Sequence, residues 1–205
     1  MIKSVYIPVV DISSLRERLE IAQSGKEYIF QKFNTDNAPF FGECRMEVFF
    51  IALLHTGNLE VESDLSKLIF EGPAIFAMSP SVLRKFVGAS NNFRSEVIFF
   101  EKAFYLKYLS DVMFLDKYPF FSESDKHLVQ LDKKQYKKIS GYYKLIREQS
   151  EGSQENSDDI VRNLLQILLF EIVNLHTVSI LFWSRAFVSK TTRSSMISPA
   201  VLPVN

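Results

Sequence analysis

Short apolar segments alternate with turn residues through the first half of the chain. The segment at 59–62 alternates apolar and acidic residues, the period-two pattern of a strand with one buried face. The segment at 45–55 begins in the same way and becomes apolar on both faces from Phe49 to Leu54, as in a strand that is covered on both sides. The predicted strands are residues 28–33, 45–55, 59–62, 68–70, 74–78 and 96–100. Such spacing is typical of a sandwich or barrel and not of a parallel sheet.

The hydrophobic period changes near Asp132. Apolar residues then recur at spacings of three and four up to Ile146, which predicts a helix that is capped by Asp132. A polar loop at 150–157 precedes a second helix, in which Asp158 and Asp159 place negative charge in the first turn. The apolar positions of this second helix are Val161, Leu165, Leu168, Ile172 and Leu175.

These five positions follow a four-three-four-three spacing, the pattern of a coiled-coil seam. The seam lasts about two heptads, so the sequence leaves two arrangements open. The helix either pairs with the same helix of a second subunit, which would make the five residues a dimer interface, or docks on its own β domain.

The pattern therefore predicts a mainly β fold with α-helices, in three parts. Residues 1–130 would form a β-roll, residues 131–180 a helical dimerisation segment, and residues 181–205 a poorly ordered tail. The tail prediction rests on the loss of periodicity past Phe187 and on the lack of acidic residues from Thr177 onward.

Composition restricts the setting of the protein. Lys+Arg and Asp+Glu each number 24, so the chain lacks the basic field of an autonomous nucleic-acid binder. The single cysteine, Cys44, cannot form an intramolecular disulfide, which favours a reducing cytoplasm. A lone cysteine beside a strand is more often inert than redox-active. The first 20 residues have no signal-peptide pattern.

The segment 164–183 is long and apolar enough to consider as a membrane span. Gln166, Glu171, Asn174 and His176 interrupt it. A carboxylate at mid-span costs roughly 2.5–3.5 kcal/mol on insertion scales, so a buried or partner-facing helix is favoured and no membrane association is expected.

Four segments of the β region share a family pattern: 44–51 (CRMEVFFI), 55–57 (HTG), 75–80 (IFAMSP) and 97–100 (VIFF). Together they resemble the N-terminal cupin-like domain of AraC-type bacterial transcription regulators, over about residues 28–176. A basic residue, Arg45, precedes an aromatic strand and a glycine turn. Ser79-Pro80 matches the usual Ser-Pro-Gly, although Ser81 replaces the glycine. Phe120-Phe121 and the paired helices also fit the family's layout.

The resemblance implies a cupin-like jelly roll, or double-stranded β-helix, followed by a C-terminal helical pair. In that family the roll senses a small-molecule effector, the helices pair two subunits, and a separate C-terminal domain binds DNA through helix-turn-helix units. Residues 177–205 are too short for such a domain and lack its pattern, so we expect the DNA-binding half to be absent, in a truncated or stand-alone sensor.

Cupin enzymes hold a metal through histidine and glutamate residues. If Gly57 is the turn glycine of the first metal motif, Phe50 stands in place of the glutamate, and Met46 and Cys44 stand in place of the histidines. Arg84 stands near the histidine of the second motif. None of these residues suits a hard metal ion, so we predict neither a metal site nor a cofactor.

The sequence also lacks a nucleophile elbow and a glycine-rich phosphate loop. We therefore predict a non-enzyme: an effector-sensing and dimerisation module that forms a homodimer, whose ligand-binding residues are unknown because a one-residue slip of register exchanges the faces of a strand. The alternative is a metal-independent cupin-like enzyme or small-molecule-binding protein that uses Glu43, Glu47 and His55. A scaffold that pairs with full-length relatives is a third hypothesis.

Overall fold

The computed structural model describes residues 7–22, 24–38, 43–63, 66–80, 83–109, 114–122, 127–152 and 154–193. Side chains are described in these ranges except at 63, 66, 83, 84, 122 and 177–193. The predicted tail is therefore described only as far as Arg193, and Ser81 lies outside the described residues. The side chain of Arg84 is likewise not described.

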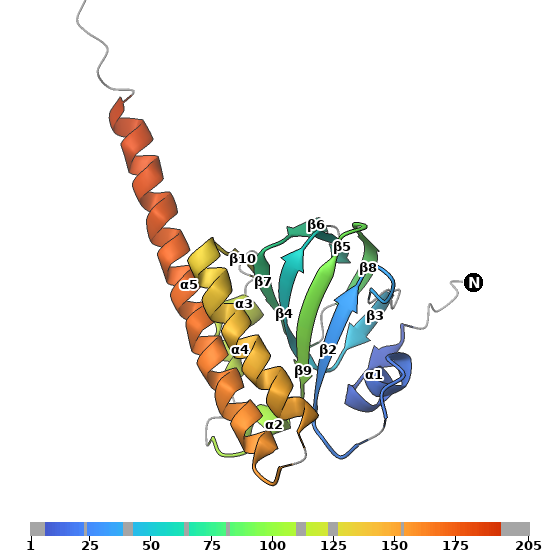
Figure 1. Cartoon of the computed structure of the whole chain (residues 1–205). Helices are drawn as coiled ribbons and strands as arrows, with labels where there is room; N and C mark the ends of the chain where they lie inside the picture. Colours follow the sequence, from blue (N-terminus) through green and yellow to red (C-terminus); the bar gives the residue numbers. More distant parts are fainter. Residues whose placement is uncertain are drawn as a thin grey trace, which may run out of the picture.

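Two five-stranded sheets and a layer of helices make up the fold (Figure 1). Sheet one has the order β1-β3-β8-β5-β6 and contains β1 (Val9–Val10), β3 (Glu43–Met46), β5 (Asn58–Ser63), β6 (Ser66–Glu71) and β8 (Leu83–Ala89). Sheet two has the order β10-β7-β4-β9-β2 and contains β2 (Tyr28–Asn34), β4 (Phe49–Thr56), β7 (Ala74–Met78), β9 (Arg94–Phe100) and β10 (Leu128–Gln130). The strands of both sheets pair antiparallel, except that β1 pairs parallel to β3.

Helices lie beyond sheet two and at the edge of sheet one. Helix α1 (Ile12–Arg18) lies near β1, and α2 (Lys102–Leu106), a 3-10 turn η1 (Leu115–Lys117) and α3 (Pro119–Ser122) follow β9. Helices α4 (Lys133–Glu151) and α5 (Ser157–Arg193) pack along each other, and Figure 1 shows the red C-terminal part of α5 extending past the sheets. Asp132 caps α4, as predicted, in a capping box with Gln135.

Sheet two is the middle layer, which explains its apolar strands. One hydrophobic cluster, which includes Phe50 and Phe99, fills the space between the two sheets. A second cluster, with Ile51 and Phe100, joins the other face of sheet two to α4 and α5. Because β4 is buried on both faces, its residues from Phe49 to Leu54 have lost the usual polar–apolar alternation.

The predicted single strand at 45–55 is wrong in one respect. The chain forms β3 in sheet one and then crosses at Glu47 and Val48 to form β4 in sheet two. Val48 is fully buried at this crossing, while Glu47 is exposed. The alternation in 45–48 and the apolar run after it thus belong to different sheets. The coarse prediction of a mainly β fold with helices is correct, and the two sheets do not close into one barrel.

Gly57 makes the tight turn between β4 and β5 that the sequence predicted. Its φ of +76° lies in the left-handed region, which L-residues with a side chain rarely adopt. A Cβ atom there would lie 2.8 Å from the backbone nitrogen of Phe93, so the close approach of a second loop also requires glycine.

Candidate functional site

The five residues of the predicted seam face the interior of their own chain. Val161, Leu165, Leu168 and Ile172 are buried in the cluster between sheet two and the helices, and Leu175 packs against that cluster. The sequence allowed either pairing with a second subunit or docking on the chain's own β domain. In the structure these side chains pack against the chain's own β domain and helices. A subunit interface through α5 would have to use another face of the helix.

The opposite face of α5 carries a second stripe with the same spacing. The exposed residues of this helix up to residue 176 are Ile160, Asn163, Ile167, Phe170 and Asn174, which follow each other at intervals of three, four, three and four. We call these five residues the outward stripe. Three of them are large apolar side chains, each at least 38% exposed.

The interior between the two sheets is filled by aromatic rings. Six phenylalanines, among them Phe50, Phe76 and Phe99, line the remaining space, which measures about 10 Å³. That volume is at the limit for one water molecule. The family resemblance predicts that the effector binds inside the roll. In this structure the space between the sheets is too small for an effector, because phenylalanine side chains fill it.

A polar network lies instead on the helix-facing side of sheet two, centred on Glu96 of β9. Arg147 of α4 donates a hydrogen bond of 2.6 Å to one carboxylate oxygen, Oε1, and Nε2 of His55 lies 3.2 Å from the other, Oε2. The carboxylate oxygen accepts from Nε2, and the other ring nitrogen, Nδ1, is hydrogen-bonded to the Tyr136 hydroxyl at 2.9 Å. The network thus fastens α4 to the sheet at two points.

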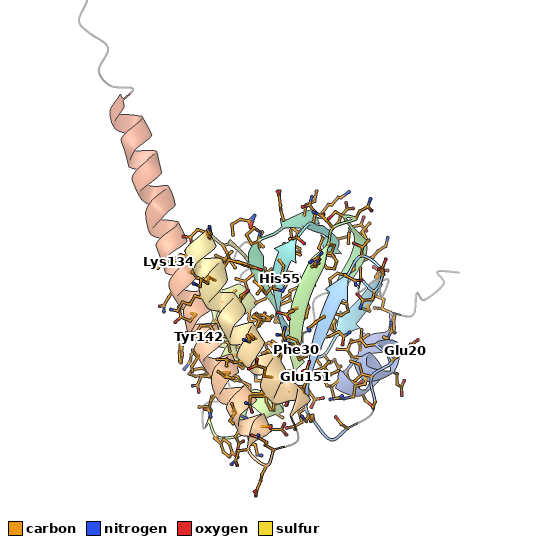
Figure 2. The ribbon with its side chains drawn as sticks, viewed as in Figure 1. Glu20, Phe30, His55, Lys134, Tyr142 and Glu151 are labelled. Carbon is orange, nitrogen blue, oxygen red and sulfur yellow. The ribbon has the colours of Figure 1, made fainter. Side chains whose placement is uncertain are left out.

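The local fold aims His55 at this network. The β4–β9 register pairs Leu54 with Ser95 and then Thr56 with Arg94, so His55 is the extra residue of a β-bulge. Figure 2 shows His55 and Phe30 on the side of sheet two that faces α4. Both ring nitrogens of His55 have partners, Nδ1 in the Tyr136 hydroxyl and Nε2 in the Glu96 carboxylate.

Burial and charge act in opposite directions on Glu96. Burial raises the pKa of its carboxyl, but the hydrogen bonds and charges of His55 and Arg147 outweigh burial and leave the pKa below its ordinary value. Nearby, the Tyr143 hydroxyl is buried without a hydrogen-bond partner among the described residues. Burial, and secondly the charge of Glu96, raise the pKa of Tyr143 well above its ordinary value.

A cleft of about 360 Å³ opens beside the network. Its charged lining consists of Lys32, Arg94 and Arg147 against the one carboxylate of Glu96. The cleft is also lined by His55, Asn34, Asn37, Phe33 and Ser95. Phe33 and Ser95 also line the filled interior, so strands β2 and β9 are the wall between the two spaces. Volumes of this size are common in small-molecule sites.

The catalytic candidates of the sequence do not converge. Glu43 is exposed on β3 of sheet one and Glu47 is exposed at the crossing between the sheets, whereas His55 is on β4 of sheet two. Glu47 and His55 both lie in the predicted strand at 45–55, but they do not share a face of one strand, because the chain changes sheets at Glu47 and Val48. Since both nitrogens of His55 are already bonded, no observation favours it as a general base.

The residues at the cupin metal positions belong to the core. Cys44, Met46 and Phe50 are buried between the sheets, and burial raises the pKa of the Cys44 thiol. Within the described ranges, no three histidine, cysteine, aspartate or glutamate side chains gather in a way that could hold a metal ion. Among the same residues, no helix is both long enough and apolar enough to cross a membrane.

Comparison with known proteins gives distant structural likenesses. No family model and no curated protein matches the chain. A solved structure of apo ToxT from Vibrio cholerae strain SCE256 matches over 88% of this chain and 62% of its own, with 10% identity and a TM-score of 0.43. The AraC-like transcriptional activator CuxR matches over 71% of this chain and 48% of its own, with 10% identity and a TM-score of 0.41.

A Cupin 2 conserved barrel domain protein from Salinispora arenicola CNS-205 matches over 39% of this chain and 68% of its own, with 14% identity and a TM-score of 0.29. The chain spans less than two thirds of the ToxT and CuxR chains. The family that the sequence resembles thus recurs among these solved structures.

Proposed function

We propose that this chain is the effector-sensing and dimerisation module of an AraC-type transcription regulator. Residues 1–130 are then the cupin-like jelly roll that senses, residues 131–180 are the helical segment that pairs two subunits, and the setting is the cytoplasm. The proposal assigns no nucleic-acid contact to the described residues, because charged groups of both signs are balanced over the chain.

The observation that carries the proposal is the double role of sheet two. Its strands β2 and β9 form a wall of the cleft, and the same sheet seats α4 and α5 on its helix-facing side. Arg147 of α4 both lines the cleft and holds Glu96. A ligand in the cleft would therefore touch the contact that fixes the helices, which is what a sensor coupled to a helical interface requires.

Dimerisation is assigned to the outward stripe and not to the buried seam. The stripe has the a/d spacing of a coiled coil, and a second copy of the chain presents the same spacing, as a two-fold interface requires. Asn163 and Asn174 belong to the outward stripe, and polar residues at such coiled-coil positions fix register at a cost in stability.

Contacts between the helices keep the stripe on the outside. Lys138 of α4 pairs with Glu171 of α5 at 2.6 Å, and the Tyr142 hydroxyl donates to the same carboxylate at 3.5 Å. On the other flank, Arg162 donates to the carbonyl of Phe104 at 2.6 Å and stacks on its ring. These contacts fix the rotation of α5 about its axis, so its solvent-facing residues are defined.

Sedimentation velocity on matched variants tests the proposal. We expect the wild-type chain to sediment as a dimer at micromolar concentration and Ile167→Lys to sediment as a monomer, because a charge would be buried between the outward stripes of the two subunits. The control is Leu145→Lys on α4, since Leu145 is 46% exposed against 44% for Ile167. A monomeric wild type, or equal effects of the two variants, would refute the assignment.

A further inference from the structure

The cleft beside Glu96 contains two cationic side chains that nothing in the described structure neutralises. Lys32 of β2 and Arg94 of β9 are exposed, and neither side chain has an ionic or hydrogen-bond partner within the described ranges. By contrast, Arg147 has a carboxylate partner in Glu96. Exposed cations often stand alone, but these two lie close together in one cleft.

Strand register places both cations on one face of sheet two. Lys32 pairs with Glu96, and Asn34 pairs with Arg94, so Lys32 and Arg94 occupy diagonal positions on neighbouring strands. Diagonal neighbours of this kind are about 7–8 Å apart at the backbone, within reach of two long side chains. One small anion between them can therefore contact both.

Glu96 does not cancel this charge. Its Oε1 accepts from Arg147 and its Oε2 is next to Nε2 of His55, so both oxygens are engaged by groups other than Lys32 and Arg94. Glu96 is only 7% exposed, so it lies beneath the cleft. Three cations against one carboxylate leave the cleft with a positive field, and a hollow surface concentrates such a field.

Asn34 supplies an oriented neutral donor. Its Oδ1 accepts from the backbone nitrogens of Asp36 and Asn37, at 2.9 and 3.1 Å, which fixes the plane of the amide. The other end of the amide, Nδ2, then has no partner in the described part of the chain. The cleft thus combines an arginine fork, an ammonium group and an amide donor, a set that matches the oxygens of a carboxylate or phosphate.

From this arrangement we propose that the cleft binds the oxyanion group of a small-molecule ligand, a carboxylate or a phosphate, through Arg94, Lys32 and Asn34. That the bound molecule is the effector rests on the proposed function, whereas the binding itself does not. Arg147 connects the anion to α4, because the same guanidinium lines the cleft and holds Glu96.

Titration of the whole chain with inorganic phosphate, and separately with acetate, tests the inference at constant ionic strength with chloride as the balancing salt. The readout is the saturable rise in melting temperature, since a ligand of the native state stabilises it by mass action. We expect Arg94→Gln to weaken the apparent dissociation constant at least about tenfold, the loss of one charge-assisted contact. Lys32→Gln combined with Arg94→Gln should abolish the rise.

The matched controls are Arg45→Gln, on the exposed face of β3 in sheet one, and Lys137→Gln, on the exposed side of α4. Each control variant removes one positive charge that lies outside the cleft, so each should bind the anions with the affinity of the wild type. Tighter binding of inorganic phosphate would indicate a phosphate ligand, and tighter binding of acetate would indicate a carboxylate ligand.

An equal shift in all variants, or no saturable shift with either anion, overturns the inference. Sedimentation of the same samples distinguishes a failure of this inference from a failure of the proposed function. Anion binding by a monomer would refute the proposed dimer and support the anion site. A dimer that binds neither anion would refute the anion site alone.

Discussion

The Glu96–Arg147 contact should hold α4 on sheet two, and a double-mutant cycle can measure its strength. Glu96→Gln removes the charge at nearly constant shape, and Arg147→Met removes the guanidinium but keeps an apolar stem. The bond is 2.6 Å long, the Glu96 side chain is 10% exposed and that of Arg147 is 26% exposed. The pair is thus largely but not fully shielded from solvent.

The expected magnitude follows from this partial burial. Breaking a fully buried ion pair costs about 3–5 kcal/mol, and exposed pairs are worth about 0.2–1 kcal/mol. We therefore expect each single variant to lose about 2 kcal/mol of unfolding free energy, with a coupling energy of about 1–2 kcal/mol between the two. For a chain of this length, a loss of about 2 kcal/mol lowers the melting temperature by roughly 4–8 °C.

Urea unfolding followed by far-ultraviolet circular dichroism gives the four unfolding free energies of the cycle. All four proteins are measured at the same concentration, because dimerisation would add to the stability of the folded state. The control cycle uses Lys144→Gln and Glu148→Gln, an i,i+4 pair on α4 at 3.8 Å whose side chains are 66% and 50% exposed. Its coupling should not exceed about 0.5 kcal/mol. A Glu96–Arg147 coupling no larger than that of the control would refute the role given to the network.

Three further predictions follow from the described contacts. Lowering the pH should remove the difference in unfolding free energy between wild type and Glu96→Gln. The pKa of Glu96 in the folded state is depressed, so the stabilisation from its charge is present above the ordinary value of 4.5 and is lost as the pH falls through the folded-state pKa. Urea unfolding at several pH values measures this trend. Gly57→Ala should cost about 1–3 kcal/mol through left-handed strain and the clash with Phe93, measured by thermal unfolding, while an alanine at Gly25, where a Cβ meets nothing, should cost little. Leu168→Ala should cost about 2–5 kcal/mol independently of protein concentration, because Leu168 is in the chain's own core; a loss that disappears at low concentration would instead place it in a subunit interface.

Much of the fold could be predicted because its sequence signals are local. The strand at 74–78 is predicted with its observed bounds, and the cap of α4 and the apolar periods of both long helices are visible in the sequence. The strand β8 was missed because its alternation is weak and Gly88 indicates a turn. The crossing at Glu47 and Val48 was missed because nothing local distinguishes it from a continuing strand.

The candidate site could not be predicted because it depends on register and layering. Glu96 was counted as part of an ordinary strand, and only its pairing with Lys32 and its position under α4 give it a role. No local feature of the sequence marks the bulge at His55. The outward stripe could have been found, since Ile160, Ile167 and Phe170 have helical spacing. The sequence points to the seam as the candidate interface because all five of its residues are apolar.

The most direct test of the account is the dimer dissociation constant, measured by sedimentation equilibrium with and without saturating phosphate or acetate, whichever binds more tightly. A sensing module requires ligand binding and subunit pairing to be linked, and such linkage is typically about 5–150-fold in affinity. We predict a change of at least about fivefold in the wild-type chain and no change in the variant that combines Lys32→Gln with Arg94→Gln. A wild-type dissociation constant that is the same with and without the anion would contradict the account.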